Sequence, residues 1–401
     1  MSEASYNSLP EELKKALARC DVLAGEDQLE LFYNLYDPET GGFYHTISSR
    51  DSEGMTPFGE ATYFVLEALR AGGMTMPDWY KEKVGNWVYN HQDEGDGFFY
   101  EDLWGKTTSG GRLHRDLSYN SGILSWCGIK PKYLLPTERI KNSVQENKEE
   151  TVASVPEYLS SKEAFIKHLD SMPWDTAHIW GTCGSFASAR SLIVAAGLWE
   201  TLNEYAVKKQ NPETGLWGEG LSWMNTNGSM KISGFFNEEH PFPMVDKIID
   251  SFIKLFTGDE PPTQATWIWN PFVLLNGVIS THKKDADEIR ALLYEKGAEI
   301  VNTAIDCALK LKKADGGFAS TLNGAIRSVQ GYVMGHGLST ESDIDGTLIA
   351  GVRLRNSMHA VFGVEPDKTY YKKYNDEFWE RLKNKPPVKK TLPNPQIALK
   401  K

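Results

Sequence analysis

Alternating apolar and polar positions along the chain predict helices that are joined in pairs. Residues 60–71 carry apolar or small side chains at positions 61, 64, 65, 68 and 69, and this stripe ends at Gly72 and Gly73. Such spacing gives a helix one apolar face, and glycines commonly follow its last turn. Pro77 then opens a second helix that runs to a turn at Gly97. The pattern therefore predicts an inner helix, facing the core, followed by an outer helix that covers it.

The same alternation continues to the end of the chain. Inner helices are expected at residues 60–71, 116–126, 184–196, 243–256, 267–279 and 343–362. Outer helices are expected at residues 10–35, with a break near Gly25, and at residues 199–209, 285–311 and 370–382. Residues 217–240 are expected to form a long loop that carries function, and residues 258–264 are too few to hold an outer helix.

A glycine-aromatic turn recurs between the helices. Its fullest copy is residues 210–218, QNPETGLWG, in which Pro212 cannot continue a helix, Gly215 permits a left-handed backbone and Trp217 folds back onto the helix just ended. Shorter copies occur at residues 37–44, 92–98 and 315–318. Counted from the glycines at positions 42, 97, 215 and 316, the gaps are 55, 118 and 101 residues, the last two close to twice the first. This period predicts six helical hairpins around one core.

Composition and charge narrow the classes of partner. Hydrophobic residues make up 40% of the 401-residue chain and charged residues 24%, which is ordinary for a globular protein. The net charge of −11 argues against nucleic acid or an anionic membrane as a partner. The four cysteines have no paired spacing, the first residues have no apolar signal core, and no apolar run is long enough to span a membrane. We expect free thiols, a cytoplasmic location, and neither metal nor cofactor.

Two of these turns resemble known repeats. Gln210, Gly215 and Trp217 are similar to the repeat motif of squalene-type triterpene cyclases, and residues 315–318, DGGF, resemble the repeat of protein prenyltransferases. The resemblance implies an all-α fold, a single (α/α)6-like toroid of about six helical hairpins, which many carbohydrate-active lyases and hydrolases also adopt. We expect the toroid to span residues 1–383 with an incomplete outer ring, and residues 384–401 to form a flexible C-terminal tail.

A second resemblance concerns an acidic motif. Residues 343–347, DIDGT, are similar to the Asp-x-Asp-Asp-Thr motif of class II terpene cyclases, and Asp345 matches the proton-donating aspartate. Gly346 replaces the last aspartate of that motif. An alternative is that Asp343 and Asp345 cap the sixth inner helix. Asp306 and Cys307 do not reproduce the spaced zinc ligands of prenyltransferases, so zinc is not expected.

Most of the titratable and aromatic side chains that we single out precede an inner helix. Because the inner helices run the same way, these side chains are expected to meet at one mouth of the toroid. The candidate catalytic residues are His114, Asp116, Asp175, His178 and Asp345. The candidate substrate-binding residues are Arg50, Glu60, Arg115, Tyr119, Trp180, Trp223, Trp267, Trp269 and His336.

The mixture of tryptophan with His, Arg, Asn and Asp favours a sugar substrate, because rings stack on aromatics while hydroxyls and carboxylates need polar partners. We therefore expect an enzyme acting on uronic-acid-containing or related oligosaccharides. A hydrolase would draw two carboxylates from Asp116, Asp175 and Asp345. A lyase would use His114, Arg115, Tyr119 or His178 to neutralise the substrate carboxylate and remove a proton. A terpene-cyclase-like enzyme using Asp345, and a non-catalytic ligand-binding toroid, are the alternatives.

Overall fold

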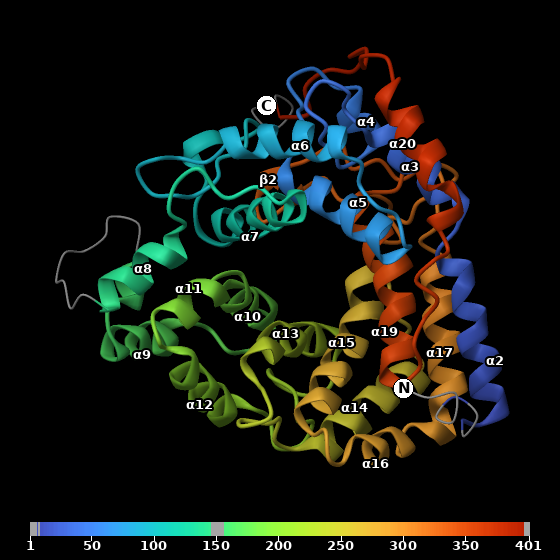
Figure 1. The fold of residues 1–401 in the computed structure, drawn as a ribbon. Coiled ribbons are helices and arrows are strands. Elements are labelled where there is room, and N and C mark those ends of the chain that lie inside the picture. Colours follow the sequence, from blue (N-terminus) through green and yellow to red (C-terminus); the bar gives the residue numbers. More distant parts are fainter. Residues whose placement is uncertain (1–5, 7–8, 146–155, 397–401) are drawn as a thin grey trace.

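Six helical segments in the described part of the chain contact one another in sequence order, and the last contacts the first (Figure 1). The computed structural model, which is largely helical, describes Tyr6 and residues 9–145 and 156–396. The six segments are α5 (Gly59–Ala71), α7 (Gly110–Cys127), α10 (Ile179–Ser188), α13 (Trp223–Ile232), α15 (Ala265–Thr281) and the continuous run of α18 (Ile344–Gly346), the π-helical η5 (Thr347–Arg353) and α19 (Leu354–Val361). The contacts between neighbours therefore form a closed cycle.

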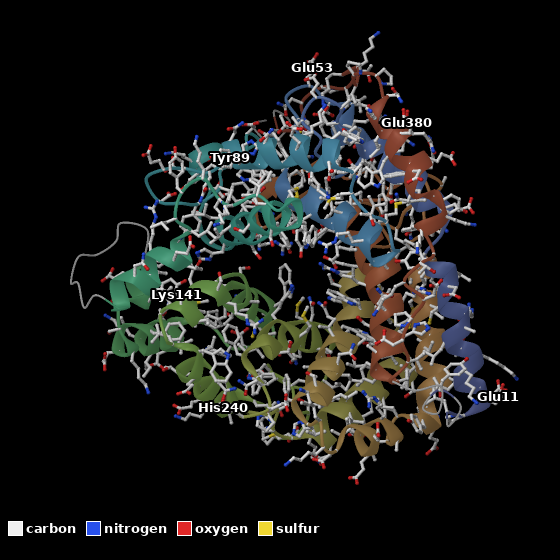
Figure 2. The ribbon with its side chains drawn as sticks, viewed as in Figure 1. Glu11, Glu53, Tyr89, Lys141, His240 and Glu380 are labelled. Carbon is white, nitrogen blue, oxygen red and sulfur yellow. The ribbon has the colours of Figure 1, made fainter. Side chains whose placement is uncertain are left out.

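The longer remaining helices lie at the periphery of this cycle (Figure 1). They are α2 (Glu11–Arg19), α3 (Glu26–Leu35), α6 (Asp78–Asn90), α8 (Pro136–Gln145), α9 (Lys162–Ser171), α12 (Trp199–Lys209), α14 (Val245–Thr257), α16 (Ala286–Ala291), α17 (Tyr294–Leu309) and α20 (Asn375–Lys383). Tyr89 on α6, Lys141 on α8 and Glu380 on α20 lie at the outer edge (Figure 2). Peripheral helices bury one apolar face only, as α14 does with Ile248 and Phe252, while Asp250 is exposed.

Shorter elements connect these helices. The connecting helices are α4 (Ile47–Arg50), α11 (Arg190–Ala195), η1 (Cys20–Leu23), η2 (Gly105–Thr107), η3 (Glu157–Leu159), η4 (Ser233–Phe235) and η6 (Lys372–Tyr374). Strands β1 (Ser328–Val329) and β2 (Tyr332–Val333) pair antiparallel in a small hairpin. The Tyr332 hydroxyl accepts a hydrogen bond from the Ser109 N–H (3.2 Å) and so attaches this hairpin to the start of α7.

The glycine-aromatic turns are closed in a similar way, although the turn at residues 312–318 is one residue shorter than the other three. Antiparallel bridges close them between Tyr36 and Phe43, Gln92 and Phe99, Gln210 and Trp217, and Lys312 and Phe318. Each turn contains a glycine in the left-handed region, such as Gly215 at φ +68°. The Trp217 ring is fully buried, and its Nε1 donates to the Ala206 carbonyl of α12 at 2.8 Å. The tryptophan therefore folds back onto the helix that has just ended.

Each of three turns is also hydrogen-bonded to the next helix of the cycle. The backbone N–H of Trp217 donates to the Ser229 hydroxyl on α13 at 3.0 Å. The equivalent bonds run from Phe43 to Thr62 on α5 and from Phe318 to Thr347 on η5, both 3.0 Å. Each hydroxyl in turn donates to the backbone carbonyl four residues earlier in the chain. A repeated hydrogen bond therefore sets the position of each turn against a central helix.

The prediction for residues 217–256 is wrong in two respects. Residues 217–240, expected to be a loop, contain α13, and residues 243–256, expected as the fourth inner helix, form the peripheral helix α14. The outer helix that precedes residues 267–279 is therefore α14 and not residues 258–264. Helix α13 buries side chains on all sides, among them Asn225, Asn227 and Ser229, so its sequence lacks the apolar stripe that predicts a helix.

Other predicted helices are interrupted. Residues 285–311 divide into α16 and α17, and residues 184–196 divide at Ala189 between α10 and α11. The last central run begins at Ile344 as predicted but becomes π-helical at Thr347, and Gly351 departs from helical dihedral angles (φ −91°, ψ −106°). The break predicted near Gly25 is confirmed, because Gly25 is the extended N-cap of α3.

The segment after residue 384, expected to be a flexible tail, is bound to the rest of the chain. Lys385 Nζ donates to the backbone carbonyls of Tyr33, Asn34 and Tyr36. The N–H of Leu392 donates to the Asp51 carbonyl at 2.9 Å. These bonds fix residues 385–392 against the end of α3 and the segment after α4. Residues 397–401 lie outside the described residues.

Buried apolar side chains from Leu9 to Leu382 form one continuous core cluster. The four cysteines are free thiols, and three of them are buried. In the described residues, no helix combines the length and the apolar character needed to cross a bilayer.

Candidate functional site

Buried charges meet at the N-terminal turns of α5 and α7. Arg112, Arg115 and Asp116 lie three and four residues apart, so the helix places them on one face. Arg112 donates to Asp116 Oδ1 from Nε (3.0 Å) and from Nη2 (2.6 Å). Arg112 and Arg115 both form ion pairs with Glu60, at the start of α5. The carboxylates of Glu60 and Asp116 therefore hold the two arginine side chains in place.

Asp116 and Glu60 are almost completely removed from solvent. Trp104 Nε1 donates to Asp116 Oδ2 at 3.1 Å. Burial raises the pKa of Asp116 to about 7 against the opposing effect of Arg112, and the nearby Glu101 also raises it. Because buried charges are tolerated only with partners, both carboxylates serve first to position the arginines.

A cavity of about 350 Å³ lies between α7, α10 and α13. Glycine and serine residues of α10, such as Gly184 and Ser188, leave this space open because their side chains are small. Gln330, in the turn of the β1–β2 hairpin, lies at one side. The larger polar and aromatic side chains in the wall are Arg112, His114, Arg115, Tyr119, Trp180 and Lys231. Among the described residues that line this cavity, none is a carboxylate.

The side chains in the wall differ in how far solvent can reach them. The Arg112 side chain is 0% exposed and the Arg115 side chain 20% exposed, so Arg115 is the accessible arginine. Trp180 is 45% exposed, which is unusual for a residue of this size. Tyr119 packs against Tyr63, with ring centroids 5.0 Å apart, and the Arg115 guanidinium lies 5.4 Å from the Tyr119 ring centre.

His114 faces this cavity and a second one of about 440 Å³, whose wall also contains Phe98, Tyr158 and His168. Burial lowers the pKa of His114 to about 4. The imidazole is therefore neutral at physiological pH, and it is a weak proton acceptor.

Lys231 contributes the amine of the cavity wall from the last turn of α13. Its side chain is half-buried, and within the described residues no hydrogen bond or ion pair involves its ammonium group. Burial, assisted by the nearby Arg115 and Arg353 cations, lowers the pKa of Lys231 to about 7, and the Asp345 carboxylate opposes this shift. Lys231 is thus a lysine that exchanges its proton near neutral pH.

The two aspartates of the acidic motif differ in role. Asp343 is the N-cap of α18: its carboxylate accepts from the Gly346 N–H (2.7 Å), the Ser320 N–H and hydroxyl, and the Ile326 N–H. The capping alternative is therefore confirmed for Asp343. Asp345 is only half-buried, and its charge acts on Lys231.

The structure brings together Glu60, His114, Arg115, Asp116, Tyr119 and Trp180, and it places the other predicted residues elsewhere. Asp175 and His178 form an exposed pair before α10, with Asp175 Oδ1 2.8 Å from His178 Nδ1. Neither residue lines the cavity between α7, α10 and α13. The hydrogen bond from His178 lowers the pKa of Asp175. Arg50 binds Asp51 and the Asn34 carbonyl, and His336 Nε2 lies 2.8 Å from the Ser52 hydroxyl.

The predicted tryptophans divide into three groups. Trp223 and Trp267 line a separate pocket of about 430 Å³, and Trp223 Nε1 donates to the Glu260 carbonyl at 2.9 Å. Trp269 donates to the Ser357 hydroxyl and lies under the Arg353 guanidinium, 5.1 Å from its ring centre. Of the four tryptophans, only Trp180 lines the cavity between α7, α10 and α13.

Sequence reasoning missed Lys231 and Arg353. Lys231 lies in α13, where the sequence predicts a loop, yet it is the sole charged residue between positions 223 and 236. A single charge in a segment that is otherwise uncharged is a signal that would have identified it.

Family models, curated proteins and solved structures offer no match to this chain. In the described residues, no group of His, Cys, Asp and Glu side chains has the arrangement of a metal site.

Proposed function

We propose that the chain is an α/α toroid and an enzyme that cleaves uronic-acid-containing oligosaccharides in the cavity between α7, α10 and α13. The closed cycle of central helices and the peripheral helices around it support the toroid. The observation that carries the function is the cavity wall, which presents the Arg115 cation, the Lys231 amine and no carboxylate among its described residues.

A wall of this kind favours an anionic ligand. The Arg115 guanidinium keeps its charge at any physiological pH and matches the planar shape of a carboxylate. Glu60 holds it in place from behind, so that little conformational entropy is lost when a substrate binds. Each hydrogen bond between a guanidinium and a carboxylate is about twice as strong as a neutral one.

The remaining wall fits a sugar ring better than a small inorganic anion. Trp180 offers a partly exposed indole against which a pyranose can pack, and Tyr119 offers a hydroxyl with no hydrogen-bond partner among the described residues. Ser185 and Ser188 add hydroxyl groups. A volume of about 350 Å³ is of the size that holds a small ligand.

Among carbohydrate-cleaving reactions, the wall favours elimination over hydrolysis. A glycosidase needs two carboxylates on either side of the bond. Here Asp116 and Glu60 are buried in ion pairs, and Asp175 is bound to His178 outside the cavity. A lyase instead needs a cation at the substrate carboxylate, because neutralising that charge acidifies the neighbouring C–H. A terpene cyclase is disfavoured, since cations in the wall oppose a carbocation.

The test is to incubate the protein with oligogalacturonate, oligomers of alginate and hyaluronan, and a neutral cello-oligosaccharide as the control. Elimination creates a C4=C5 double bond conjugated to the carboxylate, so ultraviolet absorbance and reducing ends should rise together. Hydrolysis would raise reducing ends alone. The Arg115→Gln variant should raise KM and lower kcat/KM by about a hundredfold or more. Cleavage of the neutral oligosaccharide at a comparable rate, or no cleavage of any uronate, would overturn the proposal.

A further inference from the structure

The elimination proposed above needs a base, and Lys231 is the amine that the fold places in the same cavity as Arg115. The two side chains come from different helices, α13 and α7, and both line the cavity between them. Within the described residues, Lys231 forms no ion pair, whereas Arg112 and Arg115 are both bound to Glu60. The lone pair of the Lys231 amine is therefore not engaged by a protein group.

Charged groups around Lys231 come from several elements. Arg115 lies on α7, Arg353 on η5 and Asp345 on α18, and His114 and Tyr119 on α7 share the cavity. Burial and the two arginines lower the pKa of Lys231 to about 7, while Asp345 limits the shift. A substantial fraction of the amine is thus neutral at physiological pH, which is the condition under which a base works best.

The other titratable side chains of the site are less suited to this role. The pKa of His114 is lowered to about 4, so its imidazole binds a proton weakly. Asp116 accepts hydrogen bonds from both Arg112 and Trp104 and has no free access to the cavity. Arg115 stays protonated and cannot accept a proton at all.

We infer that Lys231 is the general base of this elimination, an inference that rests on the proposed function. The neutral Nζ takes the C5 proton of the uronate whose carboxylate Arg115 binds. The electron pair of that C–H bond forms the C4=C5 double bond, and the C4–O glycosidic bond breaks. The leaving oxygen takes a proton from the Tyr119 hydroxyl. Lys231 then loses its proton and Tyr119 regains one through solvent, so the cycle needs no other reactant.

Two variants separate the base from a merely electrostatic role. Lys231→Gln removes both the charge and the amine, whereas Lys231→Arg keeps a cation of similar length that cannot accept a proton. Both should lower kcat on an oligouronide by at least a hundredfold, the scale of general base catalysis, and should change KM far less. Lys310→Gln, on the exposed end of α17, is the matched control and should leave both parameters unchanged. Circular dichroism and thermal melting check that each variant folds.

Chemical rescue supplies a measurement that loss of folding cannot imitate. Lys231→Cys followed by alkylation with bromoethylamine restores an amine at nearly the same position, and turnover should return. The sulfur lowers the pKa of that amine, so the acid limb of the pH profile of kcat/KM should move below its wild-type position near pH 7.

The outcomes distinguish the two proposals. If wild-type protein produces the unsaturated product and Lys231→Arg retains most of the turnover, Lys231 is an anchoring cation and the base assignment is wrong. Turnover that is lost in all variants but not restored by aminoethylation also contradicts it. If wild-type protein hydrolyses a uronate without releasing an unsaturated product, the proposed cleavage stands but elimination and the base assignment are wrong. If it cleaves no uronate, the proposed function fails, and the base assignment fails with it.

Discussion

Arg353 and Glu67 form a bidentate ion pair between the last and the first segments of the central cycle. Arg353 Nε donates to Glu67 Oε1 and Arg353 Nη2 to Glu67 Oε2, both at 2.7 Å. The guanidinium also lies over the rings of Phe64 and Trp269, at 4.9 and 5.1 Å from their centres. Both side chains are mostly shielded from solvent, with exposures of 20% and 27%. The pair thus joins η5 to α5 with a fixed geometry.

Removing this pair should weaken the closure of the cycle. We expect Arg353→Met to lower the free energy of unfolding by about 1.5–3 kcal/mol, the range for hydrogen bonds to charged groups. A double-mutant cycle with Glu67→Gln, followed by urea unfolding, should give a coupling energy of about 1 kcal/mol. Lys296→Met breaks the exposed Lys296–Glu299 pair on α17 and should cost less than about 0.5 kcal/mol. If Lys296→Met and Arg353→Met lower the free energy of unfolding equally, the Arg353–Glu67 pair contributes no more than an exposed surface pair.

Two tryptophans make a matched comparison of packing and binding. Trp217 is fully buried, so Trp217→Ala should lower the free energy of unfolding by about 3–5 kcal/mol, through lost contacts and a cavity. Trp180 is 45% exposed, so Trp180→Ala should change it by about 0.5 kcal/mol or less. The order should reverse for affinity, because Trp180 lines the cavity and Trp217 does not. Calorimetric titration with an oligouronide and urea unfolding measure the two effects; a large stability loss in Trp180→Ala would assign that ring to the core.

His114 should make the protein sensitive to mild acid. Burial lowers its pKa from 6.5 to about 4, so between these values the unfolded chain binds a proton that the folded chain does not. Stability is therefore complete above pH 6.5 and is lost as the pH falls toward 4. Because the side chain is partly exposed, we expect a loss on the order of 2 kcal/mol rather than the full effect of the shift.

The measurement is urea unfolding of wild-type protein and His114→Gln at pH 7 and pH 4.5. The wild-type protein should lose more stability than the variant over this interval. Burial also lowers the pKa of His168 and His359, but these contribute equally to both proteins and cancel in the comparison. Parallel pH dependence in the two proteins would show that the His114 imidazole is protonated as easily in the folded chain as in the unfolded one.

The sequence was sufficient where one physical requirement dominated a segment. Helix α5 faces the core on one side, so its apolar stripe predicted residues 60–71, and the structure has Gly59–Ala71. The turn at Gly215 needs a left-handed backbone and an aromatic plug, and both were readable from residues 210–218. Helix α13 buries small polar side chains of its own, such as Asn225 and Ser229, so its sequence shows no apolar stripe with the period of a helix.

The candidate site was predictable only where it depended on helix spacing. Arg115, Asp116 and Tyr119 share neighbouring turns of α7, so their proximity follows from the sequence. The ion pair of Glu60 with Arg115 depends on how α5 packs against α7, and the position of Lys231 depends on α13. Trp223, Trp267 and Trp269 lie in the first turns of central helices as Trp180 does, yet they contact different neighbours. Position along the chain does not specify which face of a helix a side chain occupies.

Substitution of Asp345 distinguishes uronate elimination with Lys231 as the base from polyene cyclisation with Asp345 as the acid. As a carboxylate near Lys231 it favours the ammonium form, so Asp345→Asn should lower the pKa of Lys231 further. The acid limb of kcat/KM for oligouronide cleavage should then move to lower pH by about one unit or less, with a plateau close to that of wild type. Folding should be unaffected, because the cap of α18 is Asp343 and not Asp345. Asp306 is an exposed carboxylate on α17, so Asp306→Asn is the control and should leave the profile in place.

If Asp345 instead donates the proton that starts a polyene cyclisation, the Asp345→Asn variant should fold normally but turn over a polyprenyl substrate at least a hundredfold more slowly than wild type, at every pH. An unshifted oligouronide profile would show that the Asp345 charge does not act on the group that titrates in uronate cleavage, and lost polyprenyl turnover would assign Asp345 the role of acid.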